Sequence, residues 1–324
     1  MSDRTVPTFA DVLAARRRIA AHLRPTPLFG YPALDDLLGT PVYVKHENHQ
    51  PVGAFKVRGG VNLVAQLSDD ERERGLIGAS TGNHGQSLAF AARQFGVTAH
   101  ICVPERANPV KLASMRGLGA ELIVGGADFD DARNHAERLA AEHGYRYVHS
   151  GDEPHLIAGV ATETLEILEE QPDVDVVIVA VGGGSGAAGA CITAKAINPA
   201  IHVVAVQSDA APAAYRSWKE GRPVEDECRT SAEGLATRTP FALPQEILRE
   251  HLDDFVLVSE EQIRVAQRTM IEATRNLVEA AGAAPLAAAL ELRERLQGRR
   301  IALVASGGNV SPAQLLEVLG EDRP

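Results

Sequence analysis

One lysine stands in an unusual setting, the segment GAFKVRGG at residues 53 to 60, where Lys56 lies between a phenylalanine and a valine with glycines on both sides. The chain has 32 basic residues, and the lysines are at positions 45, 56, 111, 195 and 219, so most basic positions are arginine. An ammonium group can lose its proton and become a nucleophile, which a guanidinium group cannot do. Desolvation and nearby positive charge lower the pKa of a lysine from about 10.4 toward neutrality. Lys56 is therefore a candidate nucleophile for a carbonyl group.

The segment GGGSG, residues 182 to 186, follows an apolar run of strand length. Successive glycines allow backbone N–H groups to face an anion closely, and a helix beginning here adds its N-terminal dipole. Three consecutive glycines also lose more backbone entropy than a plain turn requires. We favour a phosphate-binding loop over the alternative of a tight strand-to-helix turn.

Two further glycine-containing turns follow expected strands. In STGNHGQ, residues 80 to 86, hydroxyl, amide and free N–H groups at a strand-to-helix junction could hold a carboxylate, although Ser, Thr and Asn are also ordinary helix caps. SGGN, residues 306 to 309, ends a late strand and could be only a turn and a cap. A nucleophilic lysine, a phosphate-binding loop and a carboxylate-binding turn together indicate pyridoxal phosphate and an amino-acid substrate.

A competing interpretation uses the same glycines. GSGAAG, residues 184 to 189, matches the dinucleotide fingerprint GxGxxG, and Asp209 follows the next expected strand. The alternative is an NAD-dependent dehydrogenase, but this interpretation leaves Lys56 and the other two glycine turns unexplained.

The other candidate motifs give no metal site. HENH, residues 46 to 49, has histidines three apart and runs from an expected strand into a loop, unlike the zinc motif HExxH on a helix. The three cysteines show no CxxC spacing, which argues against a zinc site or a disulfide framework and fits a reducing cytoplasm. Cys102 is better explained as a packed strand residue than as a nucleophile.

The elements that must position these residues follow an alternating pattern. Apolar runs of strand length alternate with amphipathic segments along almost the whole chain, which is typical of an α/β protein with parallel sheets. Strands are expected at residues 41–46, 75–80, 98–103, 120–125, 174–181, 201–207, 254–259 and 300–306. Helices are expected at residues 8–23, where Thr8 and Asp11 form a capping-box variant, and at 87–96, 131–144, 260–280 and 311–320. Residues 222 to 244 lack clear periodicity and are a candidate functional loop.

Composition restricts the classes of partner. A length of 324 residues favours two lobes with a cleft, and a formal charge of -11 with a pI near 5.5 argues against nucleic acid or an anionic membrane as partner. The N-terminal residues show no signal-peptide pattern, so a cytoplasmic location is expected. The uncharged run at residues 176 to 194 is better explained as a strand, a glycine turn and the start of a helix than as a membrane span.

Five motifs in order carry a family resemblance. They are RPTPL (24–28), KHENHQPVGAFKVRG (45–59), STGNHGQ (80–86), GGGSG (182–186) and SGGN (306–309). This set resembles the fold-type II pyridoxal-phosphate enzymes, and within them the threonine/serine dehydratase and serine racemase branch. The resemblance implies a tryptophan synthase β-like α/β fold with two open, twisted, mostly parallel sheets. The cofactor would lie in the cleft between a large domain, residues 1–50 plus 150–324, and a small substrate-binding domain, residues 51–149.

The resemblance also implies roles for individual residues. Lys56 would form the internal aldimine and move the Cα proton, and Thr81 stands where racemases carry a hydroxyl that acts on the opposite face. Phe55 would lie against the cofactor ring, Asn83 would bind its phenolic oxygen, and Ser306 would face the pyridine nitrogen. The cofactor phosphate would contact Gly182, Gly183, Gly184, Ser185 and Gly186, and the substrate carboxylate would contact Ser80, Thr81, Gly82, Asn83 and His84.

The implied activity is that of a dehydratase, or ammonia-lyase. It would convert a small β-hydroxy amino acid, L-threonine or L-serine, to a 2-oxo acid and ammonia by α,β-elimination. Serine racemase, 3-hydroxyaspartate dehydratase and a non-catalytic amino-acid sensor are the alternatives. His84 stands where sulfur-replacing relatives have threonine, and Gln207, Ala211 and Ala213 occupy the place where racemases bind a divalent cation, so no metal is expected. A homodimer is also a family expectation.

Overall fold

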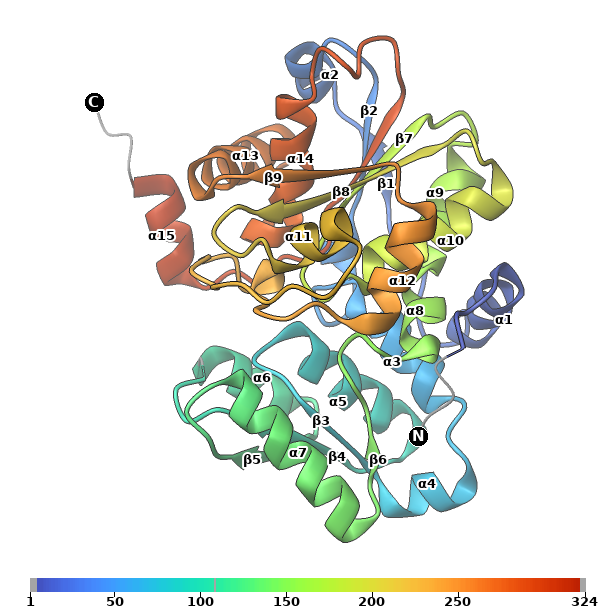
Figure 1. The fold of residues 1–324 in the computed structure, drawn as a ribbon, viewed down its shortest axis with the longest axis vertical. Coiled ribbons are helices and arrows are strands. Elements are labelled where there is room, and N and C mark those ends of the chain that lie inside the picture. Colours follow the sequence, from blue (N-terminus) through green and yellow to red (C-terminus); the bar gives the residue numbers. More distant parts are fainter. Residues whose placement is uncertain (1–4, 108, 321–324) are drawn as a thin grey trace.

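The computed structural model describes residues 5–107 and 109–320, apart from the side chain of Asp130, and shows two lobes that are each built around one sheet (Figure 1). The six-stranded sheet has the order β1 (Leu28–Gly30), β2 (Val42–Lys45), β10 (Ile301–Val304), β7 (Val176–Ala180), β8 (His202–Ser208) and β9 (Asp254–Val258). The four-stranded sheet has the order β5 (Glu121–Val124), β4 (Ala99–Val103), β3 (Leu76–Ala79) and β6 (Arg146–Tyr147). β1 pairs antiparallel with β2, and the other strand pairings of the described residues are parallel. The fold is therefore α/β with two mostly parallel sheets, as the sequence predicts.

Helices cover the sheets and the junction between them (Figure 1). Those around the six-stranded sheet and the junction are α1 (Phe9–Ile19), α2 (Pro32–Leu38), α3 (Lys56–Val64), α8 (Pro154–Val160), α9 (Thr162–Glu170), α10 (Ser185–Ile197), α11 (Ala213–Glu220), α12 (Ala242–His251), α13 (Glu260–Thr274), α14 (Ala280–Glu291) and α15 (Pro312–Gly320). Those of the other lobe are α4 (Asp69–Arg74), α5 (Asn83–Phe95), α6 (Pro109–Gly117) and α7 (Phe129–His143), and two short 3₁₀ helices are η1 (Glu47–His49) and η2 (Glu233–Leu235). Within the described ranges, no helix has the length and apolar character needed to cross a membrane.

The strand predictions are confirmed, because each of the eight expected segments contains a strand. β1 and β6 escaped prediction since they are only three and two residues long and give no alternating pattern. The capping box of α1 is also confirmed, because the Thr8 hydroxyl accepts the Asp11 N–H while the Asp11 carboxylate accepts the Thr8 N–H. The prediction of one helix over residues 260 to 280 is wrong: α13 ends at Thr274, and Arg275 adopts a left-handed φ of 57° that turns the chain before α14.

Each sheet is buried on both faces. In β7, Val177 and Val179 belong to one apolar cluster while Val176 and Ile178 belong to another on the opposite face. Strands of a parallel sheet covered by helices on both sides are expected to be apolar throughout, and this explains the uninterrupted apolar runs in the sequence. The run at residues 176 to 194 is β7, a glycine turn and most of α10.

The fold brings the three glycine turns to one region. They follow the carboxyl ends of β3, β7 and β10, the edge of a parallel sheet where ligands bind. The first turn of α3 is held to the β10 turn, because the Phe55 N–H donates to the Ser306 carbonyl at 3.0 Å and Ala54 forms an isolated bridge with Gly307. Lys56, the first residue of α3, is thereby fixed between the two lobes.

Candidate active site

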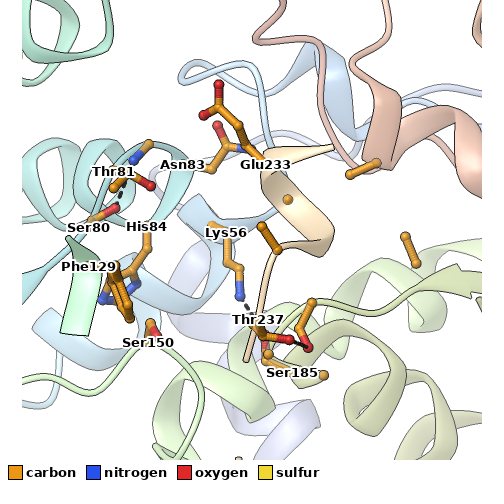
Figure 2. A pocket seen from close by; sticks show the side chains of 18 of the residues that line it. Lys56, Ser80, Thr81, Asn83, His84, Phe129, Ser150, Ser185, Glu233 and Thr237 are labelled. Carbon is orange, nitrogen blue, oxygen red and sulfur yellow. Dashed lines mark hydrogen bonds between the residues drawn. The ribbon is translucent and has the colours of Figure 1, made fainter. Parts of the chain in front are cut away.

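A cavity of about 460 Å³ lies between the two sheets, and its wall contains Lys56 together with residues from all three glycine turns. Figure 2 shows the Lys56 side chain pointing toward Ser185, with Ser80, Thr81 and His84 to one side and Glu233 and Thr237 on another wall. The segments that sequence analysis selected separately therefore meet in one place. The geometry supports a single site rather than several unrelated turns.

Lys56 is half-buried in the wall of this cavity. Its Nζ donates to the Ser185 Oγ at 2.8 Å and lies 5.0 Å from the centroid of the Phe55 ring. Desolvation lowers the pKa of Lys56 from 10.5 to about 8, and the charge of Glu163 acts in the opposite direction. A lysine with this pKa has an appreciable fraction of neutral, nucleophilic amine close to neutral pH.

The GGGSG loop is packed so closely against its neighbours that its glycines have no room for side chains. A Cβ at Gly182 would collide with the Gly234 carbonyl, and one at Gly183 would collide with the Phe241 ring. Gly184 has a left-handed φ of 87°, and α10 begins at the next residue, so the first N–H groups of this helix have no partner within it. Such a cradle of backbone donors at a helix N-terminus suits a phosphate group, and with Lys56 beside it the residues present fit pyridoxal phosphate.

The turn at residues 80 to 84 leads into α5, which begins at Asn83. The Ser80 Oγ accepts the N–H groups of Gly82 at 3.0 Å and Gly85 at 2.8 Å, so this hydroxyl also has the capping role that sequence analysis kept as the alternative. Thr81, Gly82 and Asn83 line the cavity. The N-terminus of α5 is therefore open to a carboxylate.

His84 lies under this turn and is 7% exposed, and neither of its ring nitrogens has a hydrogen-bond partner. Desolvation and the positive charge of Lys56 lower the pKa of His84 to about 3, although the Val148 backbone opposes this change. The imidazole is therefore neutral at physiological pH, and it adds no charge to the turn.

Asn83 belongs to a polar chain that sequence analysis did not anticipate. Its Nδ2 donates to the Glu279 Oε1 at 2.7 Å, and its Oδ1 accepts the Asn309 Nδ2 at 2.8 Å. Burial raises the pKa of the Glu279 carboxyl group. Asn309 stands in the SGGN motif, whereas Glu279 follows an apolar pair with no recognisable pattern, so local sequence gave no signal for it. This chain fixes the direction of the Asn83 amide in the cavity wall, which also contains Ser306.

The aperiodic segment at residues 222 to 244 lines the cavity. It contains η2 and the start of α12, and it contributes Thr230, Glu233, Thr237 and Phe241 among others to the wall. The Glu233 carboxylate forms an ion pair with Lys111 of the opposite lobe, a residue that sequence analysis did not select.

Residues of the other motifs take part in internal hydrogen bonding and packing. Glu47 of HENH is fully buried and accepts two hydrogen bonds from Arg58, and Gly189 of GSGAAG packs against Ala161, where a Cβ would lie 2.8 Å from the Ala161 Cα. Burial raises the pKa of the Cys102 thiol to about 11. Among the described residues, no group of three or more His, Cys, Asp or Glu side chains could hold a metal ion. The Gln207 Oε1 accepts the Tyr215 N–H.

Comparison with known proteins adds independent information. A family model described as pyridoxal-phosphate dependent enzyme matches residues 19–307. The chain is 38% identical over 304 residues to the L-threonine ammonia-lyase of Thermotoga maritima, which covers 94% of this chain and 76% of that one. It is 35% identical over 322 residues to the L-threo-3-hydroxyaspartate ammonia-lyase of Saccharomyces cerevisiae, with coverage of 98% and 99%. The crystal structure of serine racemase from Dictyostelium discoideum superposes with a TM-score of 0.90 at 34% identity, covering 95% of this chain and 100% of that one.

Proposed function

Because the chain belongs to the family of pyridoxal-phosphate dependent enzymes and has the fold of its fold-type II members, we propose that its cavity removes water and ammonia from a small β-hydroxy amino acid. The chain is a pyridoxal-phosphate dependent lyase, and the products of such an elimination are a 2-oxo acid and ammonia. One observation carries the assignment of the site: the Lys56 amine, whose pKa is lowered to about 8, lies between an anion cradle and a turn open to a carboxylate.

The cofactor would be held by residues of the cradle and its surroundings. The N–H groups of Gly182, Gly183, Gly184, Ser185 and Gly186 would bind the phosphate, with Phe55 along the ring, Asn83 at the phenolic oxygen and Ser306 at the pyridine nitrogen. Bound pyridoxal phosphate supplies an aldehyde that links covalently to amines and a ring that accepts negative charge from the substrate Cα. A neutral serine hydroxyl at the ring nitrogen does not favour a protonated ring as a carboxylate would, and this favours prompt loss of a β-substituent.

The substrate would be held and deprotonated by residues of the chain itself. Its carboxylate would rest on the turn formed by Ser80 to His84, where the backbone N–H groups and the hydroxyls of Ser80 and Thr81 are the available donors. The Ser80 Oγ accepts two backbone hydrogen bonds and still has its own O–H to donate. Because His84 is neutral, it would form no ion pair with the substrate carboxylate, which would be bound by hydrogen bonds. The Lys56 Nζ would take the Cα proton, which requires an amine that is neutral part of the time.

Threonine and serine are the proposed substrates, in their L forms. The names of curated relatives support this choice, because several are L-threonine ammonia-lyases. The yeast relative makes L-threo-3-hydroxyaspartate the second candidate. Thr81, on the turn opposite Lys56, makes racemisation of serine a third possibility, which the serine racemase likeness supports.

The test is ammonia release from purified protein supplied with pyridoxal phosphate. L- and D-serine, L- and D-threonine and L-threo-3-hydroxyaspartate are compared, each with and without magnesium. We expect release from L-threonine or L-serine, and loss of both release and the visible cofactor absorption in Lys56→Ala. Turnover that survives in Lys56→Ala, or cofactor bound without turnover of any of these amino acids, would refute the proposal, and the second result would favour an amino-acid sensor.

Three further assignments complete the proposal. The small domain comprises residues 51–149 and the large domain residues 1–50 plus 150–324, which the separation of the two sheets supports. The protein works in the cytoplasm, supported by three cysteines without disulfide bonds. It assembles as a homodimer, which gel filtration with light scattering can test.

A further inference from the structure

Five ionisable side chains are buried together behind the first turn of α3. Lys45, Glu47, Arg58 and Glu163 are 0% exposed and Glu166 is 4% exposed, and the cavity wall includes none of them. They come from β2, η1, α3 and α9. Burying a charge is unfavourable unless a partner compensates for it, so the pairing of these five groups needs an explanation.

Arg58 binds two of the other four groups, Glu47 and Glu166, and Lys45 is connected to it through Glu166. Its Nε and Nη2 donate to the two oxygens of Glu47 at 2.7 Å each, and its Nη1 and Nη2 donate to the two oxygens of Glu166 at 2.8 and 2.7 Å. The Lys45 Nζ donates to the Glu166 Oε2 at 2.7 Å and to the Thr26 carbonyl at 2.8 Å. A guanidinium group that binds two carboxylates in this way ties α3 to η1 and α9.

Glu163 differs from the other two carboxyl groups. Neither of its oxygens has a hydrogen-bond partner. The positive charges of Lys45 and Arg58 are already balanced by Glu47 and Glu166. Among the described residues, one further ion pair reaches these groups, between Arg16 and Glu166 at 3.8 Å, and Arg16 has its own partner in Glu169 at 3.5 Å. A third negative charge would be uncompensated.

The pKa changes of Glu166 and Glu163 agree with this balance of charges. Burial raises the pKa of Glu166, but hydrogen bonds and charge from Arg58 and Lys45 lower it further, so that it falls well below its usual value. Burial and the negative charge of Glu47 raise the pKa of Glu163 well above its usual value. Both effects favour the protonated, neutral form of Glu163 over the carboxylate.

The cluster is connected to Lys56 in two ways. Arg58 is two residues after Lys56, so the guanidinium contacts fix the same helical turn. A negative charge on Glu163 would raise the pKa of Lys56, whereas His84, whose own pKa is lowered to about 3, is neutral. A charged Glu163 would thus oppose the loss of the proton from Lys56.

We propose that Lys45, Glu47, Arg58 and Glu166 form a charge-balanced positioning cluster, which fixes the first turn of α3 and leaves Glu163 as an uncharged neighbour of Lys56. This inference rests on the proposed role of Lys56 and deepens it. One consequence is specific: loss of one negative charge from the cluster makes Glu163 ionise in its place.

The experiment measures the proton affinity of Lys56 directly. The full-length protein, freed of cofactor with hydroxylamine, is labelled with acetic anhydride from neutral to alkaline pH, and labelling of Lys56 is quantified by peptide mass spectrometry. Glu166→Gln should move the labelling midpoint up by about one pH unit, because Glu163 then becomes charged. Glu163→Gln should leave the midpoint within about 0.3 unit of wild type, and adding it to Glu166→Gln should reverse the shift. Glu169→Gln is the matched control, since Glu169 lies on the same helix, is 53% exposed and pairs with Arg16 outside the cluster.

Arg58→Lys tests positioning in the loaded enzyme. It keeps a charge but cannot bind both carboxylates in the same way, so we expect a fall in kcat of about tenfold with KM within about twofold. Arg72→Lys is its control, because Arg72 contacts carbonyl groups at the other end of α3.

Each outcome decides the proposal. A folded Glu166→Gln protein with an unchanged midpoint, or a shift that the double variant retains, would overturn it. A midpoint about one unit lower in Glu163→Gln alone would show that Glu163 is charged, and this arm decides the question if Glu166→Gln does not fold. Unchanged kcat in Arg58→Lys would overturn the positioning role. Labelling needs no turnover, so inactivity of the wild-type protein with a normal midpoint would count against the proposed function alone.

Discussion

At the scale of single residues, Lys56 combines a cavity position with a pKa lowered to about 8. Burial explains this value, because the amine loses contact with water and donates a hydrogen bond only to the uncharged Ser185 hydroxyl among the contacts of the described residues. The sequence indicated which lysine to select, since its setting is apolar and glycine-rich. The size and direction of the pKa change depend on burial between the lobes, which local sequence does not specify.

The lowered pKa predicts a pH dependence of stability. Because the pKa of Lys56 in the folded protein lies below its unfolded value of 10.5, the unfolded chain binds more protons between about pH 8 and pH 10.5. The unfavourable effect of the buried ammonium is fully present below pH 8 and disappears as the pH rises through this window. The free energy of unfolding of cofactor-free wild type, relative to that of Lys56→Met, should therefore rise from pH 8 to pH 10, as measured by urea denaturation. A difference that is flat over this window would contradict the assignment.

At the same scale, Gly183 predicts a steric effect on the cradle. A methyl group in Gly183→Ala would collide with the Phe241 ring, so the loop must shift. We expect the affinity for pyridoxal phosphate to fall by at least about tenfold, equivalent to about 1.4 kcal/mol, measured by titration of the cofactor absorption. Gly117→Ala is the control, because a Cβ there would meet nothing within 4 Å. Equal cofactor affinity in both variants would be inconsistent with the cradle.

At the scale of elements, the start of α1 follows from local sequence, whereas the end of α13 does not. Thr8 and Asp11 give a reciprocal pattern within four residues, and the structure forms both hydrogen bonds. The end of α13 has no such pattern, because Arg275 adopts the left-handed conformation that glycine usually occupies.

The capping box itself can be tested. Thr8→Ala removes the acceptor of the Asp11 N–H and should lower the free energy of unfolding by about 1 kcal/mol, measured by urea denaturation. Thr8→Ser keeps the hydroxyl and should stay within about 0.3 kcal/mol of wild type. Cofactor binding should be unchanged in both, because the cap lies outside the cavity wall. A stable Thr8→Ala protein would show that the cap contributes little.

At the scale of the whole molecule, two ion pairs connect the lobes at the cavity, and each lobe contributes the cation to one pair and the carboxylate to the other. Lys111 of α6 pairs with Glu233 of η2, and Asp128, next to α7, lies 3.9 Å from Arg238 in the aperiodic segment. Both pairs join side chains that line the cavity wall. They favour the arrangement in which the lobes enclose the substrate.

The interlobe pair predicts a change in substrate binding. Glu233→Gln should raise KM for the amino acid about threefold or more with a smaller change in kcat, and raising the salt concentration should reduce the difference between variant and wild type because it screens the wild-type pair. Arg222→Gln is the control, since Arg222 pairs with Glu220 within one lobe. An unchanged KM at low salt would exclude a contribution of this pair to closure.

Eight of the strands, the glycine turns that follow three of them and the identity of the central lysine can be predicted from local sequence, because they depend on periodicity and residue types within a few positions. Three relations could not be predicted in this way: Glu279 accepts a hydrogen bond from Asn83, Lys111 pairs with Glu233, and Glu163 has no hydrogen-bond partner among buried charges. These relations join residues more than a hundred positions apart, or arise from the loss of water around them. Both depend on how the two sheets pack, and no local pattern of residues encodes that packing.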